Sequence, residues 1–171
     1  EHRHHRISSE CVSIAHCEPR LLIARCKSVC LDFYIIAGHA PYRDEKHDYV
    51  EYWRRFKSIV NKACASGVPR VCGIDANCQM HSWLLWDRCC DANVSAKRAP
   101  SNFNHFCDAI HGSNMSPTNC NSSKLKNEIC PGTFVPKRGN KQITIDYITH
   151  TSDVYVSSGS VSQEVGISIA R

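Results

Sequence analysis

The chain has 171 residues, of which 42% are hydrophobic and 22% charged, a composition typical of a globular protein with its own core. No segment is apolar for long enough to cross a membrane as a helix, so membrane-spanning classes are excluded. The formal net charge of +5 favours polyanionic partners.

The first residues indicate an internal piece of a longer protein. Residue 1 is Glu rather than Met, and residues 1–6 have the pattern of neither a signal peptide nor a normal start. We expect residues 1–19 to form a basic, histidine-rich, partly ordered segment. Residues 20–171 are expected to form one partial domain.

Twelve cysteines are spread along the chain without a single Cys-x-x-Cys pair, so zinc ribbons and fingers are not indicated. Several lie in apolar stretches, where a free thiol behaves as a small hydrophobic group. We favour buried reduced thiols, with disulfides and a metal cluster as alternatives. The metal-like cluster would comprise His2, His4, His5, Cys11, His16 and Cys17, and a solvated basic tail is the competing interpretation of it.

The first half of the domain predicts a hairpin, a helix and a further strand. Apolar runs at 21–26 and 31–37, separated by a polar turn, are typical of a β-hairpin. Residues 45–64 predict an amphipathic helix, because apolar side chains recur at steps of three and four residues: Val50, Trp53, Phe56, Val60 and Ala63. Gly67 and Pro69 end this helix, and a buried strand over 70–76 follows.

The second half predicts a shorter helix and several strands. Residues 102–110 carry an apolar stripe of Phe103, Phe106, Cys107 and Ile110, and the polar residues 112–127 indicate a loop. Residues 83–86 predict a short buried turn or a mobile cover. Further strands are expected at 133–136, 142–149, 154–156 and 161–165. Strand pairs separated by surface helices indicate an α/β sandwich.

Polar side chains stand at or within the predicted strands. His39 ends one apolar run, Asp75 and Asn77 end the strand over 70–76, and Asp146 interrupts another run. In an extended strand Asp75 and Asn77 would point the same way, about 7 Å apart, and could hold a hard cation, a water or a phosphate oxygen. Each residue also has a structural explanation, as a turn residue or a backbone partner. Four together fit one shared polar site.

Four short motifs carry a resemblance. They are His39-Ala-Pro, Ile74-Asp-Ala-Asn, Gly132-Thr-Phe and Ile145-Asp-Tyr-Ile. Their order resembles the endonuclease/exonuclease/phosphatase superfamily, and most of all the endonuclease domains joined to reverse transcriptases in non-LTR retrotransposons. The family's usual Gly-Asp-Phe-Asn is here Gly-Ile-Asp-Ala-Asn. The resemblance implies an α/β (α+β) fold, a two-layer β-sandwich of mostly antiparallel sheets flanked by helices, which is incomplete in this chain.

The resemblance also assigns roles in phosphodiester hydrolysis. His39 would contact the scissile phosphate, Asp75 would orient or activate the attacking water, and Asn77 would hold that water or a phosphate oxygen. Asp146 would support a catalytic histidine. Asp75 and Asn77 are the candidate ligands of Mg²⁺ (or Mn²⁺). Substrate binding is assigned to Thr133 and Arg43.

Two of the family's expected features have no counterpart in the sequence. One is the metal-binding Glu on an early strand, and the other is the Asp-His pair near the C-terminus. The expectation is therefore a DNA endonuclease in the parent protein, nuclear if derived from a retroelement, with the isolated chain nearly inactive. DNA is favoured over RNA as the partner. Two alternatives stay open: hydrolysis of inositol phosphates or phospholipids on the same fold, and a zinc-dependent Cys/His interaction module.

Overall fold

A computed structural model describes residues 7–42, 46–78, 101–117 and 145–154 of the protein. Its main element is a six-stranded mixed sheet in the order β1-β2-β3-β4-β6-β5. The strands are β1 (Val12–Glu18), β2 (Leu21–Lys27), β3 (Asp32–His39), β4 (Arg70–Asp75), β5 (Ser116–Pro117) and β6 (Asp146–His150). The remaining elements are a 3₁₀ turn η1 (Ser9–Cys11) and the helices α1 (Lys46–Ala63) and α3 (Ser101–His111).

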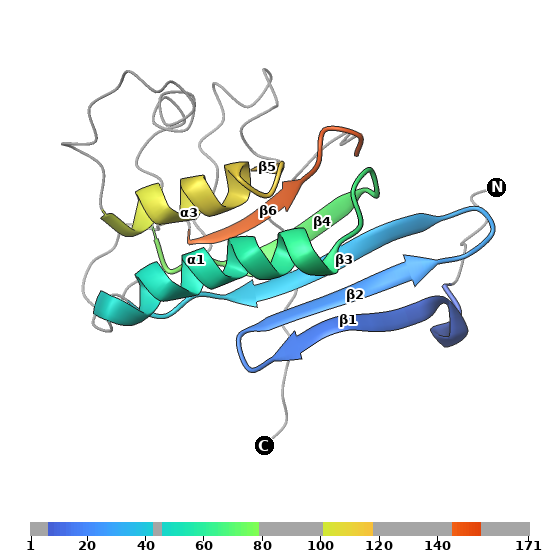
Figure 1. Ribbon diagram of the computed structural model, residues 1–171, viewed down its shortest axis with the longest axis horizontal. Helices are drawn as coiled ribbons and strands as arrows, with labels where there is room; N and C mark the ends of the chain where they lie inside the picture. Colours follow the sequence, from blue (N-terminus) through green and yellow to red (C-terminus); the bar gives the residue numbers. More distant parts are fainter. Residues whose placement is uncertain (1–6, 43–45, 79–100, 118–144, 155–171) are drawn as a thin grey trace, which may run out of the picture.

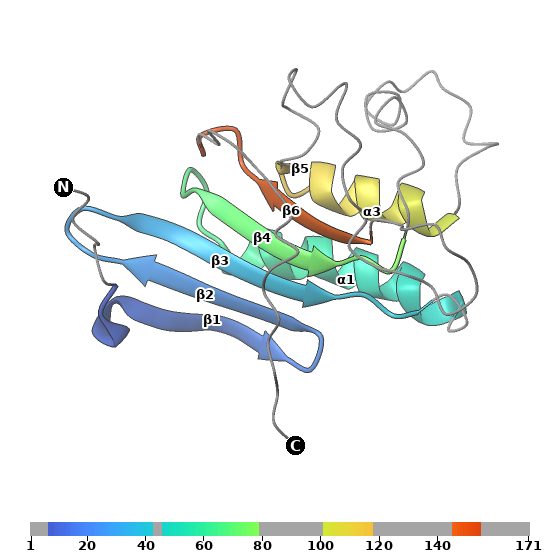
Figure 2. The same ribbon diagram turned by 180° about the vertical axis from the view of Figure 1, so that it is seen from behind.

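Both helices lie on one face of the sheet (Figures 1 and 2). Between them and the strands is an aromatic core in which Trp53 packs edge-on against Phe106 at a ring-centroid distance of 5.2 Å. Phe106 in turn lies 5.0 Å from the ring of Tyr147 on β6, so α1, α3 and the sheet share one cluster. Burial of this apolar surface is the main source of stability for the two layers. Neither helix is long and apolar enough to span a membrane within the described part of the chain.

The predicted elements are confirmed in their main lines. The hairpin is β2 and β3, the two helices are α1 and α3, and the strand over 70–76 is β4. Gly67 has the positive φ of 73° expected of a residue in the turn after α1. The α+β class is therefore correct, although the described residues form only one sheet of the expected sandwich.

Several details of the sequence prediction are wrong. Residues 12–18 form the edge strand β1, which the sequence analysis left within the N-terminal segment. Val50 is 40% exposed rather than part of the buried stripe, because Tyr49 and Tyr52 occupy the inner face of α1. The predicted loop 112–127 contains the two-residue strand β5. The strands expected at 133–136 and 161–165, most of 154–156, and the segment 83–86 lie outside the described residues.

Eight cysteines are described, and all carry free thiols. Five of them are buried: Cys26, Cys64, Cys72, Cys78 and Cys107. Burial raises the pKa of the Cys72 thiol to about 12, with a smaller opposing contribution from the Thr149 hydroxyl. This thiol is therefore protonated at neutral pH and behaves as an apolar core group.

Candidate functional site

Three of the predicted site residues lie side by side where β3 and β4 end and β6 begins. β3 and β4 are parallel, and their register pairs His39 with Asp75. β4 and β6 are antiparallel, and their register pairs Asp75 with Asp146. Paired residues on neighbouring strands project to the same face of a sheet. The three side chains therefore form a row across three strands.

The row lies on the face of the sheet away from the helices. Gly38, the neighbour of His39, faces α1, since a Cβ built on it would meet the hydroxyl of Tyr52. His39 consequently points to the other side, where 62% of its side chain is exposed. Asp75 follows the buried Ile74 in the same alternation and is half-buried. The His39 side chain is therefore largely exposed, and the Asp75 side chain is partly exposed.

Asp75 makes two contacts, one with His39 in the row and one with Asn77 in the turn after β4. Its Oδ2 lies 3.6 Å from Nε2 of His39, a distance too long for a hydrogen bond but close enough for an ion pair when the histidine is protonated. Its Oδ1 accepts a 3.0 Å hydrogen bond from the main-chain N–H of Asn77. The carboxylate is thus held in place by the turn that follows β4.

Asn77 does not continue the strand, so the extended geometry that the sequence analysis assumed for Asp75 and Asn77 is wrong. Its φ is +45°, in the left-handed region that asparagine tolerates better than most residues. Its Nδ2 donates a 2.7 Å hydrogen bond to the carbonyl of Ala40, and the Ala40 N–H donates to the carbonyl of Asp75 at 2.8 Å. The Asn77 carboxamide therefore ties the segment after β3 to the end of β4.

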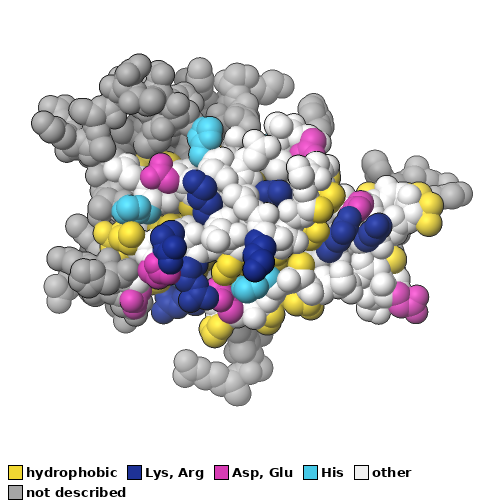
Figure 3. Space-filling view, viewed as in Figure 1, with side chains coloured by type: hydrophobic (Ala, Val, Ile, Leu, Met, Phe, Trp, Pro, Cys, Tyr) yellow, Lys and Arg dark blue, Asp and Glu magenta, His cyan; other side chains and the backbone are white. Residues whose placement is uncertain are grey.

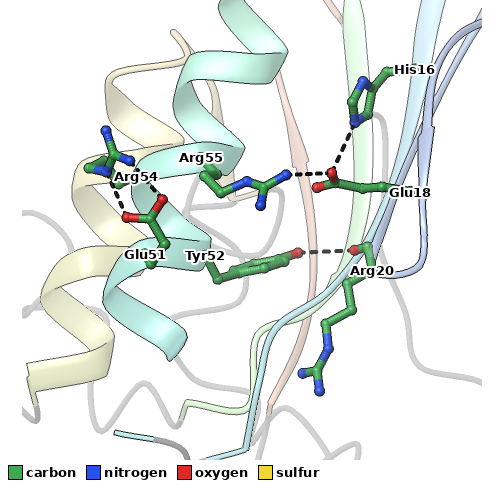
Figure 4. Close-up of polar contacts among 7 residues, drawn as sticks. All are labelled: His16, Glu18, Arg20, Glu51, Tyr52, Arg54 and Arg55. Carbon is green, nitrogen blue, oxygen red and sulfur yellow. Dashed lines mark hydrogen bonds and ion pairs between the residues drawn. The ribbon is translucent and has the colours of Figure 1, made fainter. Parts of the chain in front are cut away.

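The helices support the site from behind. The Tyr52 hydroxyl on α1 donates to the carbonyl of Arg20 at 3.3 Å (Figure 4). The His39 N–H donates to the same carbonyl at 3.0 Å. Burial raises the pKa of Tyr52 far above its usual value, so its hydroxyl is a stable donor. On β6, the Tyr147 hydroxyl donates to the carbonyl of Cys78 at 3.0 Å.

Sequence patterns alone did not single out these supporting residues. Tyr52 and Tyr147 are buried aromatic residues, and in the sequence they cannot be distinguished from ordinary core positions. The only signal is chemical: a tyrosine on a buried face needs a partner for its hydroxyl. Which main-chain carbonyl provides that partner depends on the packing of distant segments.

The predicted magnesium ligands, Asp75 and Asn77, provide one carboxylate and one carboxamide at the end of β4. Mg²⁺ in proteins commonly uses one or two carboxylates together with substrate phosphates and water. Among the described residues there is no group of three or more His, Cys, Asp or Glu side chains that could hold a metal ion.

Several of the other residues singled out in the sequence fall outside the described part of the chain. Thr133 and Arg43 fall outside the described residues, as do His2, His4 and His5. His150 is four residues along β6 from Asp146, roughly 13 Å away at the usual rise per residue. It is buried, and its Nδ1 lies 2.8 Å from the carbonyl of Thr151. His150 therefore does not join the row.

By sequence, no protein-family profile and no curated protein matches the chain. By structure, the endonuclease domain of TRAS1, a telomere-specific non-LTR retrotransposon, matches with a TM-score of 0.52 and 11% identity, over 78% of this chain and 51% of that one. Sphingomyelinase C from Streptomyces griseocarneus matches with a TM-score of 0.50 and 12% identity, over 84% of this chain and 47% of that one. An endonuclease/exonuclease/phosphatase family protein from Bacteroides thetaiotaomicron matches with a TM-score of 0.46 and 12% identity, over 77% of this chain and 40% of that one.

The chain spans about half the length of the first of these proteins and less of the other two. At such low sequence identities, the similarity concerns only the arrangement of the backbone, that is, the order of the strands and the helices on one face of the sheet. The fold of the chain is therefore similar to that of the TRAS1 endonuclease domain and of sphingomyelinase C.

Proposed function

We propose that the parent protein hydrolyses phosphodiester bonds in nucleic acid, and that His39, Asp75, Asn77 and Asp146 form part of its active site. The observation that carries the proposal is the row formed by His39, Asp75 and Asp146 at the ends of three adjacent strands. These residue types are the ones needed to contact a phosphate and orient a water. His39 is largely exposed and Asp75 is partly exposed, as contact with a substrate requires.

Each side chain has a task in this scheme. His39 donates a hydrogen bond from its ring to a phosphate oxygen, and Asp75 accepts one from the attacking water. The Asn77 N–H holds the Asp75 carboxylate in the orientation that this requires. A Mg²⁺ or Mn²⁺ ion would be held by Asp75 and Asn77 and would stabilise the negative charge that develops on the phosphate oxygens. Asp146 would support a catalytic histidine.

Nucleic acid is the proposed substrate because of Tyr42 and the net charge. Tyr42 is 63% exposed, three residues after His39, and offers an aromatic face on which a base can stack. The net charge of +5 favours a polyanion.

The basic residues of α1 do not add to this argument. Arg54 is paired with Glu51 at 2.7 Å and Arg55 with Glu18 at 2.8 Å (Figure 4). Figure 3 shows acidic side chains among the basic ones on this helix-covered face. The His39–Asp75–Asp146 row lies on the opposite face of the sheet.

The test is plasmid nicking by the 171-residue chain in excess over DNA, with Mn²⁺ or Mg²⁺ and with EDTA. We expect slow, EDTA-sensitive nicking that falls at least 100-fold in Asp75→Asn, since a positioned acid or base commonly contributes about 10²- to 10⁴-fold. Asp153→Asn, an exposed acid outside the row, serves as the matched control and should leave the rate unchanged.

Four results would count against the proposal. Absence of nicking at the highest concentration of the chain would overturn hydrolysis at this row. Equal nicking rates in the unsubstituted chain and in Asp75→Asn would overturn it as well. Rapid multiple turnover by the isolated chain would overturn the expectation that it is nearly inactive. Cleavage of p-nitrophenyl phosphorylcholine in preference to DNA would shift the substrate class to phospholipids.

A further inference from the structure

A buried asparagine connects the core to the turn that carries Asn77. Asn102, in the first turn of α3, is only 6% exposed. Its Oδ1 accepts a 2.8 Å hydrogen bond from Nε1 of Trp53 on α1. Its Nδ2 donates to the main-chain carbonyl of Asn77 across 3.4 Å, a weak hydrogen bond that is longer than usual. One carboxamide therefore links α1, α3 and the end of β4.

The turn at Asn77 needs such an external contact. A non-glycine residue at positive φ occupies a sparsely populated conformation, which persists where the surroundings hold it. The N–H of Asn77 is held by Asp75 and its side chain by Ala40. The Asn77 carbonyl is the third polar group of this residue, and Asn102 is its hydrogen-bond donor.

The orientation of Asn102 follows from its other partner. The indole N–H of Trp53 can only donate, so the carboxamide oxygen must face Trp53 and the NH₂ group must face Asn77. Trp53 is 2% exposed and packs against Phe56 and Phe106, so its ring is fixed by the core. The donor directed at Asn77 is thereby fixed as well.

We infer that Asn102 is a positioning residue for the Asp75–Asn77 turn. It acts through the Asn77 carbonyl and sets the geometry in which the Asn77 N–H binds the Asp75 carboxylate. Its effect on turnover rests on the proposed function, whereas its effect on the turn does not. α3 is therefore part of the support of the site as well as a cover for the sheet.

The experiment is amide hydrogen exchange of the full chain by NMR, with Asn102→Asp as the test variant. This change keeps the shape and the acceptor for Trp53, and replaces the donor to Asn77 with an oxygen. We expect exchange of the Asn77 amide to accelerate at least tenfold, while the Ile74 amide in β4 keeps its rate. Asn102→Ser, which removes most of the carboxamide, should have the same local effect and covers the case in which a buried aspartate unfolds the chain.

Asn61→Asp is the matched control. Asn61 also donates from Nδ2 to a main-chain carbonyl, that of Gly112 at 2.8 Å, but at the other end of the helix pair. It should leave Asn77 exchange unchanged. Two results with Asn102→Asp would overturn the inference. One is equal acceleration of amide exchange at Asn77 and Ile74, because it indicates global destabilisation. The other is unchanged exchange at Asn77.

Turnover gives a second readout. In single-turnover nicking, Asn102→Asp should lower the maximal rate at least tenfold while the substrate concentration for half-maximal rate stays within about twofold. A loss confined to substrate affinity would contradict a positioning role. If the unsubstituted chain does not nick DNA but Asn102→Asp still accelerates exchange of the Asn77 amide alone, the proposed function is refuted and the role of Asn102 is supported.

Discussion

Gly38 is the position at which packing behind the site can be tested most directly. A Cβ added there would lie 2.8 Å from Cδ1 of Ile74, 3.0 Å from the hydroxyl of Tyr52 and 3.1 Å from Cγ1 of Ile74. Carbon atoms in contact prefer about 3.5–4.0 Å. Ile74 is 3% exposed and Tyr52 is 9% exposed, so neither side chain has free space to move into. Gly38→Ala therefore overpacks the core directly beside His39.

The expected magnitude follows from two opposing effects. An extra methyl group in a packed core costs about 1–3 kcal/mol, whereas replacing glycine by alanine gains about 0.4–1 kcal/mol through the unfolded chain. We expect a net loss of roughly 1–2 kcal/mol in the free energy of unfolding for Gly38→Ala. Gly73, on the neighbouring strand, has nothing within 4 Å of a built Cβ, so Gly73→Ala should be neutral or stabilising.

Urea unfolding followed by far-UV circular dichroism measures both changes. A double-mutant cycle with Ile74→Val isolates the cause, because valine lacks the Cδ1 atom of the closest contact. Ile74→Val alone should lower the free energy of unfolding by about 0.5–1.5 kcal/mol. The same change made in the Gly38→Ala variant should lower it by less, because it relieves the close contact. Equal stabilities of Gly38→Ala and Gly73→Ala, or additive effects in the cycle, would refute the packing argument.

Two further predictions concern charge. Arg70 is buried, and its guanidinium donates hydrogen bonds to the carbonyl of Ser113 at 3.1 Å and to that of Cys64 at 3.5 Å. Arg70→Met should therefore lower the free energy of unfolding, measured in urea, by about 2–4 kcal/mol. Arg54, which forms an exposed ion pair with Glu51, is the control, and a cost for Arg70→Met no larger than that for Arg54→Met would contradict the prediction. The Arg25 guanidinium, 2.7 Å from Asp32, holds the pKa of that carboxyl below its ordinary value. The stabilisation by this pair is therefore present above about pH 4 and is lost as the pH falls through the lowered pKa. In Asp32→Asn, the free energy of unfolding should consequently fall less steeply on the acid side of its pH dependence. An unchanged pH dependence in this variant would exclude the effect.

The elements that the sequence predicted correctly are those with a strong local pattern. The apolar stripe of α1 and the two runs of the β2–β3 hairpin are visible within short windows, because side-chain period and turn residues act between near neighbours. β1 was missed because it is an edge strand whose Val12 and Ile14 are exposed, so burial does not shape its sequence strongly. Val50 was misplaced because periodicity defines a stripe but not its margins.

The grouping of His39, Asp75 and Asp146 was predicted from the order of motifs, and its geometry was decided by the tertiary structure. α1 connects β3 to β4 as parallel neighbours, which brings the ends of both strands to one edge of the sheet. The sequence identified the polar residues at these ends, but it contains no information on register, which depends on how distant strands pair.

The conformation of Asn77 and the contacts of Asn102, Tyr52 and Tyr147 required the folded chain. Each of these side chains meets a carbonyl at least twenty residues away in sequence. A buried polar group must find a partner, so the sequence determined that such contacts would form. Which partner each one found was decided by the packing of the helices against the sheet.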